Sequence, residues 1–408
     1  MANLPADPHV VVFSSLFPSE RQPQAGLFVR ERMFRVGRTL PLAVVSPRPW
    51  FPFQAWVSRW RPGFRPGAHR QETQAGVQIW YPRFLSLPGM LKHLDGLFMA
   101  LGAWPQLRRL RQQGRLDLID AHFGYPDGYA ATLLGRWLGV PVTITMRGTE
   151  QRHAKDATLL PRLRHALSQA SRVFSVSQSL RATALALGIA EDHVRVVGNG
   201  VDLEKFNPVP QEQARRSLGV AVDAPVLVSV GGLVERKGFH RVIALLPALR
   251  ERFPGLQYLV VGGPSPEGDM STALHKQVVD LGLEDVVRFL GPVAPERLHL
   301  PLSAADVFVL ATRNEGWANV FLEAMACGLP VVTTDVGGNS EVVCQPGLGR
   351  IVPFDDGPGL REAVADALVT PWDRPAIRRY AADNTWDSRV AVLIDEFRRL
   401  HRRPPVRL

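Results

Sequence analysis

Short runs of apolar, mostly β-branched residues recur along the whole chain, and segments with helical spacing separate them. Such runs are typical of buried strands, and strands that alternate with helices indicate parallel sheets covered by helices on both faces. The pattern therefore predicts an α/β protein of doubly wound type. The predicted strands are His9–Ser14, Leu42–Ser46, Val77–Tyr81, Leu116–Ala121, Val140–Met146, Val173–Val176, Val194–Val197, Pro225–Val230, Gln257–Val261, Val286–Leu290, Val307–Leu310, Pro330–Thr334 and Arg350–Val352.

This pattern occurs twice, on either side of a joint that contains Gly, Asn and Pro at residues 198–208. A chain of 408 residues is long for one hydrophobic core and suits two domains. We predict domains over residues 1–198 and 199–385, followed by a terminal segment, 386–408, that has a helical pattern. Sheets of this kind bind ligands beyond the carboxyl ends of their strands, so we expect functional motifs directly after strands.

The stretch NEGWANVFLEAMACGLPVVTTDVGGNSE, residues 314–341, contains two such carboxylates. Glu315 lies in the loop after a predicted strand, and Glu323 lies about one turn into a helix that begins near Asn319. Backbone N–H groups at that helix N-terminus, near Val320, favour an anion. Two acceptors for hydroxyl groups beside an anion site fit a nucleotide sugar. The alternative is a helix N-terminus that carries acids only because they stabilise it.

Glycines and two cations follow the first strand of the second half. Gly231 and Gly232 leave that strand, and Arg236 and Lys237 come just before the next helix. A flexible turn with two cations suits a pyrophosphate, although a solvated basic loop has the same composition. In the first half, Gly26 precedes a helix and would let backbone approach a phosphate.

Several motifs are absent from the sequence. No G-x-G-x-x-G follows a strand, which argues against a dinucleotide dehydrogenase, and no P-loop is present. No His/Cys cluster has metal-ligand spacing, so we expect neither a metal nor a cofactor. The two cysteines, Cys327 and Cys344, do not suggest a disulfide framework and favour a reducing compartment.

The pattern E-G-x-x-N-x-x-x-E-A-M-A-C-G-x-P-V-V-x-T-x-x-G-G, with R-K-G upstream and N-G-V-D at the joint, resembles the group 1 (family 4) retaining glycosyltransferases of GT-B fold. The resemblance implies two Rossmann-like domains that face a central cleft, the first for the acceptor and the second for a nucleotide-diphosphate sugar. It implies metal-independent sugar transfer with retained anomeric configuration to a saccharide or lipid-linked acceptor. It also implies that the terminal helix crosses back to the first domain.

The resemblance assigns roles to the motif residues. Glu315 would bind donor sugar hydroxyls and Glu323 the ribose. Arg236 and Lys237 would hold the diphosphate, helped by Gly26 and by the helix that begins near Asn319. Cations aimed at the leaving diphosphate stabilise the charge that develops there. The departing phosphate would itself take the acceptor's proton, so that no dedicated base is needed.

The sequence departs from the family pattern at two places. Many relatives have G-R where this chain has Gly231–Gly232, so Arg236 would carry more of the phosphate binding. Many also have H-G where this chain has Arg147–Gly148, and a guanidinium cannot act as acid or base. Arg147 would brace the donor or bind an acidic acceptor, or else form an ion pair with Glu150. His122 follows another strand and would approach the acceptor, unless it is held locally, for example by Asp127.

Net charge is +10, and residues 48–115 hold eleven Arg or Lys but only two acids. Such a segment, with five tryptophans, fits a solvated face, an anionic membrane or acceptor surface, or nucleic acid. The segment Leu91–Gln113 is amphipathic and either packs on its own sheet or docks on a membrane. Its apolar side is expected to comprise Leu91, Leu94, Leu97, Phe98, Leu101, Trp104, Leu107 and Leu110. We expect peripheral contact with an anionic membrane and no nucleic-acid partner.

The N-terminus has no basic segment followed by an apolar one, and no run approaches the length of a spanning helix. These features favour a cytoplasmic protein. The resemblance, together with the basic segment, implies an enzyme that is peripheral at the inner face of the membrane and builds a polysaccharide or glycolipid. Two alternatives stay open. One is another GT-B enzyme, a phosphorylase or epimerase, although none of the five lysines has a convincing cofactor setting. The other is a non-catalytic nucleotide-sugar-binding partner subunit.

Overall fold

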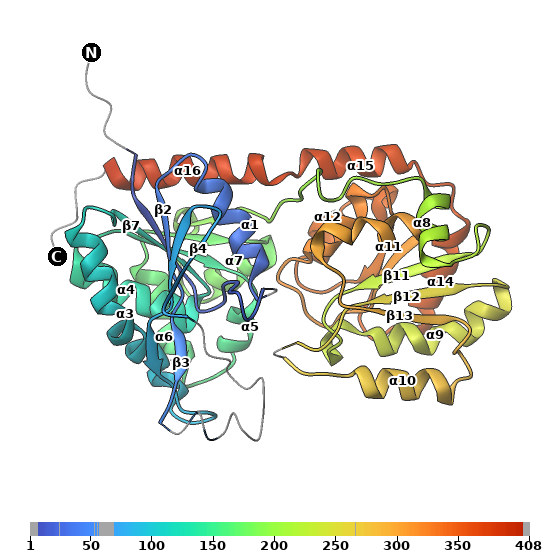
Figure 1. The fold of residues 1–408 in the computed structure, drawn as a ribbon, viewed down its shortest axis with the longest axis horizontal. Coiled ribbons are helices and arrows are strands. Elements are labelled where there is room, and N and C mark those ends of the chain that lie inside the picture. The colour runs from blue at the N-terminus through green and yellow to red at the C-terminus, as the bar shows by residue number, and fades with distance from the viewer. Residues whose placement is uncertain are drawn as a thin grey trace, which may run out of the picture. The chain divides into compact units, whose positions relative to one another are not determined.

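The computed structural model describes residues 7–402 except 24, 53, 55, 57–68 and 266. The chain separates into two compact units (Figure 1). The first unit comprises residues up to Asn199 together with those from Trp386 onward, and the second runs from Gly200 to Thr385. Each unit is built around its own sheet.

The first unit has an eight-stranded sheet in the order β10-β9-β8-β7-β1-β2-β5-β4, parallel except for the edge pair β4–β5. That pair is a hairpin whose turn residues, Ala75 and Gly76, both have positive φ, as its tight turn requires. A separate parallel pair joins β3 and β6. The strands are β1 (Val10–Phe13), β2 (Leu42–Val45), β3 (Arg48–Trp50), β4 (Gln71–Gln74), β5 (Val77–Trp80), β6 (Arg83–Leu85), β7 (Leu118–His122), β8 (Val142–Met146), β9 (Arg172–Ser175) and β10 (Val194–Val196).

Helices cover both faces of this sheet. The first and last helices, α1 and α16, share one core cluster with β1, in which Met33 and Phe397 are fully buried. The terminal helix thus belongs to the first unit, because its apolar stripe completes that core. On the opposite face α4 packs on β8, where Gly135 lies against Val142. The helices are α1 (Leu27–Val36), η1 (Lys92–Leu94), α3 (Asp95–Gln112), η2 (Gly124–Gly128), α4 (Tyr129–Leu138), α5 (Thr149–His153), α6 (Leu160–Gln169), α7 (Gln178–Ala186), η3 (Glu191–His193) and α16 (Trp386–Arg402).

The buried side of α3 differs from the one expected from sequence. Leu107 and Leu110 are buried as expected, but Leu97 and Leu101 are exposed. The reason is that small residues give a closer fit: a Cβ on Gly102 would lie 2.4 Å from the carbonyl oxygen of Arg83 in β6. The helix therefore packs through its small residues and turns part of its leucine side outward. Its buried residues are Asp95, Gly96, Met99, Ala100, Ala103, Leu107 and Leu110.

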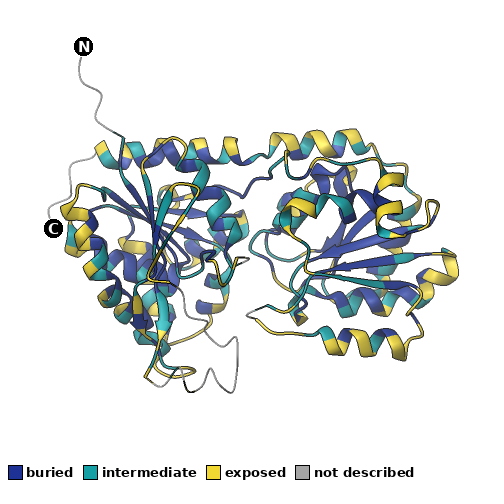
Figure 2. Ribbon diagram, in the orientation of Figure 1, coloured by how far each residue is buried: buried dark blue, intermediate teal, exposed yellow. Residues whose placement is uncertain are grey.

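The second unit has six parallel strands in the order β13-β12-β11-β14-β15-β16. Side chains of β11 alternate between two core clusters: Val228 packs on the face with α12 and α15, and Leu227 on the face with α9 and α14. Figure 2 shows the central strands of both sheets as buried and the outer sides of the helices as exposed. The elements are α8 (Gln211–Leu218), β11 (Val226–Val230), η4 (Glu235–Lys237), α9 (Phe239–Arg252), β12 (Gln257–Val261), α10 (Ser271–Asp280), β13 (Val287–Gly291), η5 (Pro295–Arg297), α11 (His299–Ala304), β14 (Val307–Leu310), α12 (Asn319–Ala326), β15 (Val331–Thr334), α13 (Asn339–Val342), η6 (Pro346–Leu348), β16 (Gly349–Val352), α14 (Gly357–Val369) and α15 (Arg374–Asp383).

The predicted α/β class is confirmed, and every predicted strand is found with its ends shifted by at most two residues. The strands that the sequence pattern did not indicate are β3, β4 and β6, which are short and lie at or beyond the sheet edge. Arg59, Arg61 and Arg65 of the basic segment lie outside the described residues. Within the described ranges, no helix combines the length and the apolar character needed to cross a bilayer.

Candidate functional site

The strand order of the second unit defines a topological switch point between β11 and β14. From these two central strands the chain leaves toward opposite sides of the sheet, which opens a crevice at their carboxyl ends. The loop after β11 carries Arg236 and Lys237, and the loop after β14 carries Glu315. The residues selected from the sequence are therefore placed together by the topology.

Glu315 is the centre of this cluster and is only 8% exposed. Its Oε1 accepts hydrogen bonds from Lys237 Nζ at 2.6 Å, Arg236 Nη1 at 3.2 Å and Thr312 Oγ1 at 3.2 Å. Arg236 also forms a two-pronged ion pair with Glu267, with Nη2 2.9 Å from Oε1. The hydrogen bond to Glu267, followed by the charge of Glu315, raises the pKa of Arg236, so it is a permanent cation. Both cations are paired with carboxylates that a bound anion could replace.

Two glycines explain why small residues surround this glutamate. A Cβ on Gly337 would lie 1.8 Å from the carbonyl oxygen of Glu315, and one on Gly238 would lie 1.9 Å from that of Ala311. Both glycines have left-handed backbone, with φ of 56° and 75°. The loops after β11, β14 and β15 therefore press directly on one another, which fixes the position of Glu315.

Helix α12 starts at Asn319, immediately beyond this loop, and no side chain caps its N-terminus at Ala318. Glu323 is the fifth residue of the helix and is half-buried, about one turn in as expected. Val320, at the second position, lies in the first turn. The beginning of a helix whose dipole favours anions thus follows the cation–carboxylate cluster directly in the chain.

The first unit has a polar cluster at the carboxyl edge of its own sheet. His122 ends β7 and Arg147 follows β8, its neighbour in the sheet. Arg147 Nε donates to His122 Nδ1 at 3.0 Å, and its Nη1 donates to Asn199 Oδ1 at 3.2 Å. The guanidinium also stacks over Phe28, 4.9 Å from the ring centroid. Arg147 is therefore held from several directions.

His122 is fully buried, and Asp120 lies on its other side. Because Nδ1 accepts from Arg147, the ring proton lies on Nε2, which is 3.2 Å from Asp120 Oδ2. Asp120 in turn accepts a hydrogen bond from the hydroxyl of Thr143 at 2.6 Å. Burial, with a further effect of the Arg147 charge, lowers the pKa of His122 to about 4. The imidazole is therefore neutral at physiological pH.

Two local pairings that the sequence left open as alternatives are not formed. Asp127 does not hold His122; it accepts hydrogen bonds from the backbone N–H and the hydroxyl of Ser15. Glu150 accepts from the backbone N–H groups of Arg147 and Gly148 at 3.1 and 2.8 Å, whereas the Arg147 guanidinium turns to His122. Backbone N–H groups at the start of α5 therefore satisfy Glu150, as expected for a carboxylate at a helix N-terminus.

The remaining predicted glycines also have local packing contacts. Gly26 caps α1 with φ of 71°, and a Cβ there would lie 2.3 Å from the carbonyl oxygen of Leu16. Gly231 lies under the stem of Lys237, and Gly232 lies beside Ser265. Gly26 and the Arg236 cluster belong to different units, so the proposed phosphate contact of Gly26 stays a prediction.

Sequence reasoning missed Glu267 and Asp120. The signal for Glu267 was its place after β12, in the Gly262–Gly263–Pro264 turn region, but nothing in the sequence pairs it with Arg236. Asp120 precedes His122 by two residues in a strand, so both side chains lie on one face. No group of three or more His, Cys, Asp or Glu side chains in the described part of the chain could hold a metal ion.

Family comparisons agree with this geometry. Residues 210–384 match the family described as Glycosyl transferases group 1, and residues 57–205 match Glycosyltransferase Family 4. A D-inositol 3-phosphate glycosyltransferase of Saccharomonospora viridis is 33% identical over 310 residues, 71% of each chain. The chain belongs to the group 1, family 4 glycosyltransferases.

Two further similarities extend over nearly the whole chain. The putative teichuronic acid biosynthesis glycosyltransferase TuaC of Bacillus subtilis is 27% identical, and the alignment covers 94% of this chain and 91% of TuaC. The structure of Anabaena Alr3699/HepE in complex with UDP and glucose has a TM-score of 0.73 at 19% identity, covering 95% and 99% of the two chains. That similarity confirms the predicted GT-B fold.

Proposed function

We propose that this glycosyltransferase transfers a sugar from a nucleotide-diphosphate donor with retained anomeric configuration and without a metal ion. The observation that carries the proposal is the cluster of Arg236, Lys237 and Glu315 at the switch point of the second unit. A relative in fold binds UDP and glucose. In this site the two cations hold the diphosphate, Glu315 the sugar hydroxyls and Glu323 the ribose, while the first turn of α12, at Asn319 and Val320, faces the phosphates.

Bond cleavage in such a donor leaves negative charge on the diphosphate while the sugar becomes oxocarbenium-like. Lys237 and Arg236, in their pre-formed positions, stabilise the charge where it develops, which is the role that a divalent cation takes in other enzymes. As the diphosphate enters, the cations exchange carboxylate partners for phosphate oxygens. Glu315 is then released toward sugar hydroxyls, and the leaving phosphate accepts the acceptor's proton.

In the first unit, we assign Arg147 to contact with substrate, as a fixed cation for a donor phosphate or an acidic acceptor. Its guanidinium has a fork geometry that suits either group. His122 is buried and neutral, so its part is to position Arg147 through the Nε–Nδ1 hydrogen bond. The D-inositol 3-phosphate glycosyltransferase, by its name, acts with a phosphorylated compound.

The acceptor is proposed to be a saccharide or lipid-linked glycan in polysaccharide or glycolipid synthesis. TuaC is named for the biosynthesis of teichuronic acid. The proposed site of action is the cytoplasmic face of an anionic membrane, with the protein bound peripherally. The strongly basic segment 48–115 supports this proposal through its attraction to anionic headgroups.

The first test is thermal stabilisation by a panel of nucleoside diphosphates and sugar nucleotides. A ligand that binds only the folded state raises the melting temperature by mass action. One nucleotide should stabilise the wild type, and the shift should shrink in Glu323→Ala but not in Glu362→Ala, which removes an exposed carboxylate of α14. If no nucleotide stabilises the folded protein, the donor-site assignment is wrong.

With the donor identified, turnover tests the chemistry. The product should keep the anomeric configuration of the donor, read from its proton NMR spectrum, and a chelator should leave the rate unchanged. An inverted product contradicts retention, and a rate that chelation removes and added metal restores contradicts metal independence. Stabilisation by the donor without turnover across a wide acceptor panel would favour a non-catalytic binding subunit.

A further inference from the structure

Large exposed apolar side chains are concentrated in one region of the first unit. Among the described residues, twelve such side chains are exposed, and seven of them lie between Trp50 and Leu101. The second unit has only four of these described side chains, of which Val279 and Leu281 alone are close in the chain, and a few exposed apolar side chains are normal for a protein surface. The concentration is therefore a local property. We define the apolar surface as Trp50, Leu85, Met90, Leu91, Leu97 and Leu101.

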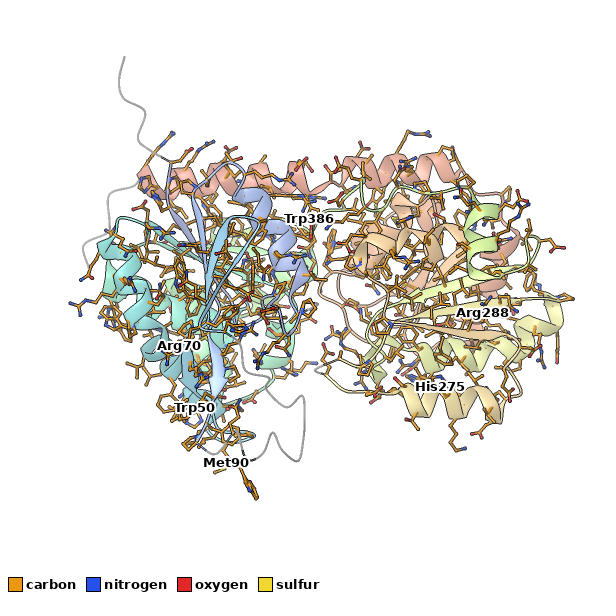
Figure 3. The ribbon with its side chains drawn as sticks, viewed as in Figure 1. Trp50, Arg70, Met90, His275, Arg288 and Trp386 are labelled. Carbon is orange, nitrogen blue, oxygen red and sulfur yellow. The ribbon has the colours of Figure 1, made fainter. Side chains whose placement is uncertain are left out.

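These residues come from elements that pack on one another. Trp50 and Leu85 are register partners in the β3–β6 pair, so their side chains are neighbours. Helix α3 packs against β6, and Leu97 and Leu101 are one turn apart on it. Met90 and Leu91 lie in the turn between β6 and the helix. Figure 3 shows Trp50 and Met90 at the same end of the first unit.

The turn holds its apolar side chains outward at a cost in backbone energy. Leu91 has left-handed backbone, with φ of 50°, which is unfavourable for a residue with a branched side chain. Met90 is 63% and Leu91 is 47% exposed, so burial within the chain does not offset this cost. An exposed apolar turn in a strained conformation points to a surface that becomes buried in a partner.

Positive charge borders this surface. Arg83 lies in β6, two residues before Leu85. Arg108 and Arg109 lie in α3 beyond Leu101, and all three arginines are exposed. The two acids of the segment are occupied: Glu72 accepts from Tyr81 and Gln74, and Asp95 accepts from Ser86 and Lys92. The border of the apolar surface is therefore cationic, because both acids of segment 48–115 already have hydrogen-bond partners.

We propose that the apolar surface inserts into the interface of an anionic membrane, with the bordering arginines on the lipid headgroups. The inference rests on the proposed function in one respect, since it names the surface for the peripheral contact proposed above. Apolar insertion combined with headgroup attraction is the combination that binds proteins peripherally to membranes. The cationic border favours a lipid surface over a second copy of the chain, which would bring like charges together.

The test uses the full chain and vesicles of phosphatidylglycerol or phosphatidylcholine, without nucleotide. The wild type should bind phosphatidylglycerol vesicles, less so as salt rises, and bind phosphatidylcholine vesicles weakly. Met90→Glu combined with Leu101→Glu should reduce the partition constant by roughly tenfold or more, because both side chains lose their insertion and add like charge to the lipid. Val279→Glu combined with Val369→Glu, at positions 60% and 61% exposed in the second unit, is the matched control and should bind as the wild type does.

Melting temperatures show whether each variant is folded, and stabilisation by the donor nucleotide should be the same in both. No binding of the wild type to anionic vesicles, or equal binding of the two double variants, would overturn the proposal while leaving the donor site untouched. Dimerisation of the wild type that Met90→Glu/Leu101→Glu abolishes would assign the surface to a second copy instead. If no donor nucleotide stabilised the wild type, that result would contradict the proposed function but not the membrane surface.

Discussion

The polar clusters of the two units differ in how exposed their side chains are, and therefore in how easily a ligand can reach them. In the second unit, Arg236 and Lys237 keep partly exposed side chains, and we propose that phosphate oxygens replace their carboxylate partners. In the first unit, Asp120 and His122 are buried and serve to hold one guanidinium, that of Arg147. Diphosphate binding needs exchangeable charges, whereas orientation of a single group needs fixed partners. The comparison predicts that the same kind of substitution has different effects in the two clusters.

The largest effect is expected at Lys237, to which we assign a positive charge next to the leaving diphosphate. Lys237→Ala should lower kcat/KM by roughly 10²–10³-fold, because a pre-positioned charge at the leaving group is lost. Lys276→Ala, which removes a lysine paired with Asp280 on the surface of α10, is the control. Equal kinetics for the two variants would show that the cluster does not bind the donor.

His122 should affect stability as a function of pH more than it affects chemistry. Its pKa in the folded state, about 4, lies below the ordinary value of 6.5, so the unfolded chain binds more protons between these values. The contribution of His122 to the free energy of unfolding is therefore greatest above pH 6.5. It decreases by about 3 kcal/mol as the pH drops toward 4. His122→Asn, which keeps an acceptor for Arg147, should flatten that dependence in denaturant titrations. An unchanged slope would mean that the imidazole is charged in the folded protein.

Substitution of Arg147 should have an intermediate effect on turnover. Arg147→Ala and Arg147→Lys should both lower kcat/KM by roughly 10- to 100-fold, because lysine cannot keep contacts to both His122 and Asn199. Arg152→Ala, an exposed arginine in the adjoining helix, should be neutral. Non-additivity between Arg147→Ala and His122→Asn would show that the two act as one unit, and full activity of Arg147→Ala would assign the cluster to structure.

The smallest effect is expected at Glu267, which in the proposed site would compete with the diphosphate for Arg236. Glu267→Gln should tighten binding of a nucleoside diphosphate by about two- to fivefold in calorimetry, since a partly exposed ion pair contributes little. Glu362→Gln breaks comparable exposed pairs, with Arg252 and Arg361, and should leave the affinity unchanged. Weaker binding after Glu267→Gln would mean that the carboxylate orients Arg236 toward the ligand.

The sequence by itself determined the strands, the class of fold and most of the residues that meet in the polar cluster of the second unit. It could do so because buried parallel strands are continuous apolar runs and because ligand groups follow such strands directly. Glu315, Arg236 and Lys237 were found in this way, each within a few residues of a strand end.

Only the tertiary structure decided which side chains meet and which apolar residues stay outside. Glu267 reaches Arg236 from 31 residues away, and Arg147 turns to His122 rather than to Glu150 beside it. Leu97 and Leu101 of α3 point outward because Gly102 and its small neighbours fit β6 more closely. A periodic pattern gives the faces of a helix, but close packing between elements distant in sequence selects the face that is buried.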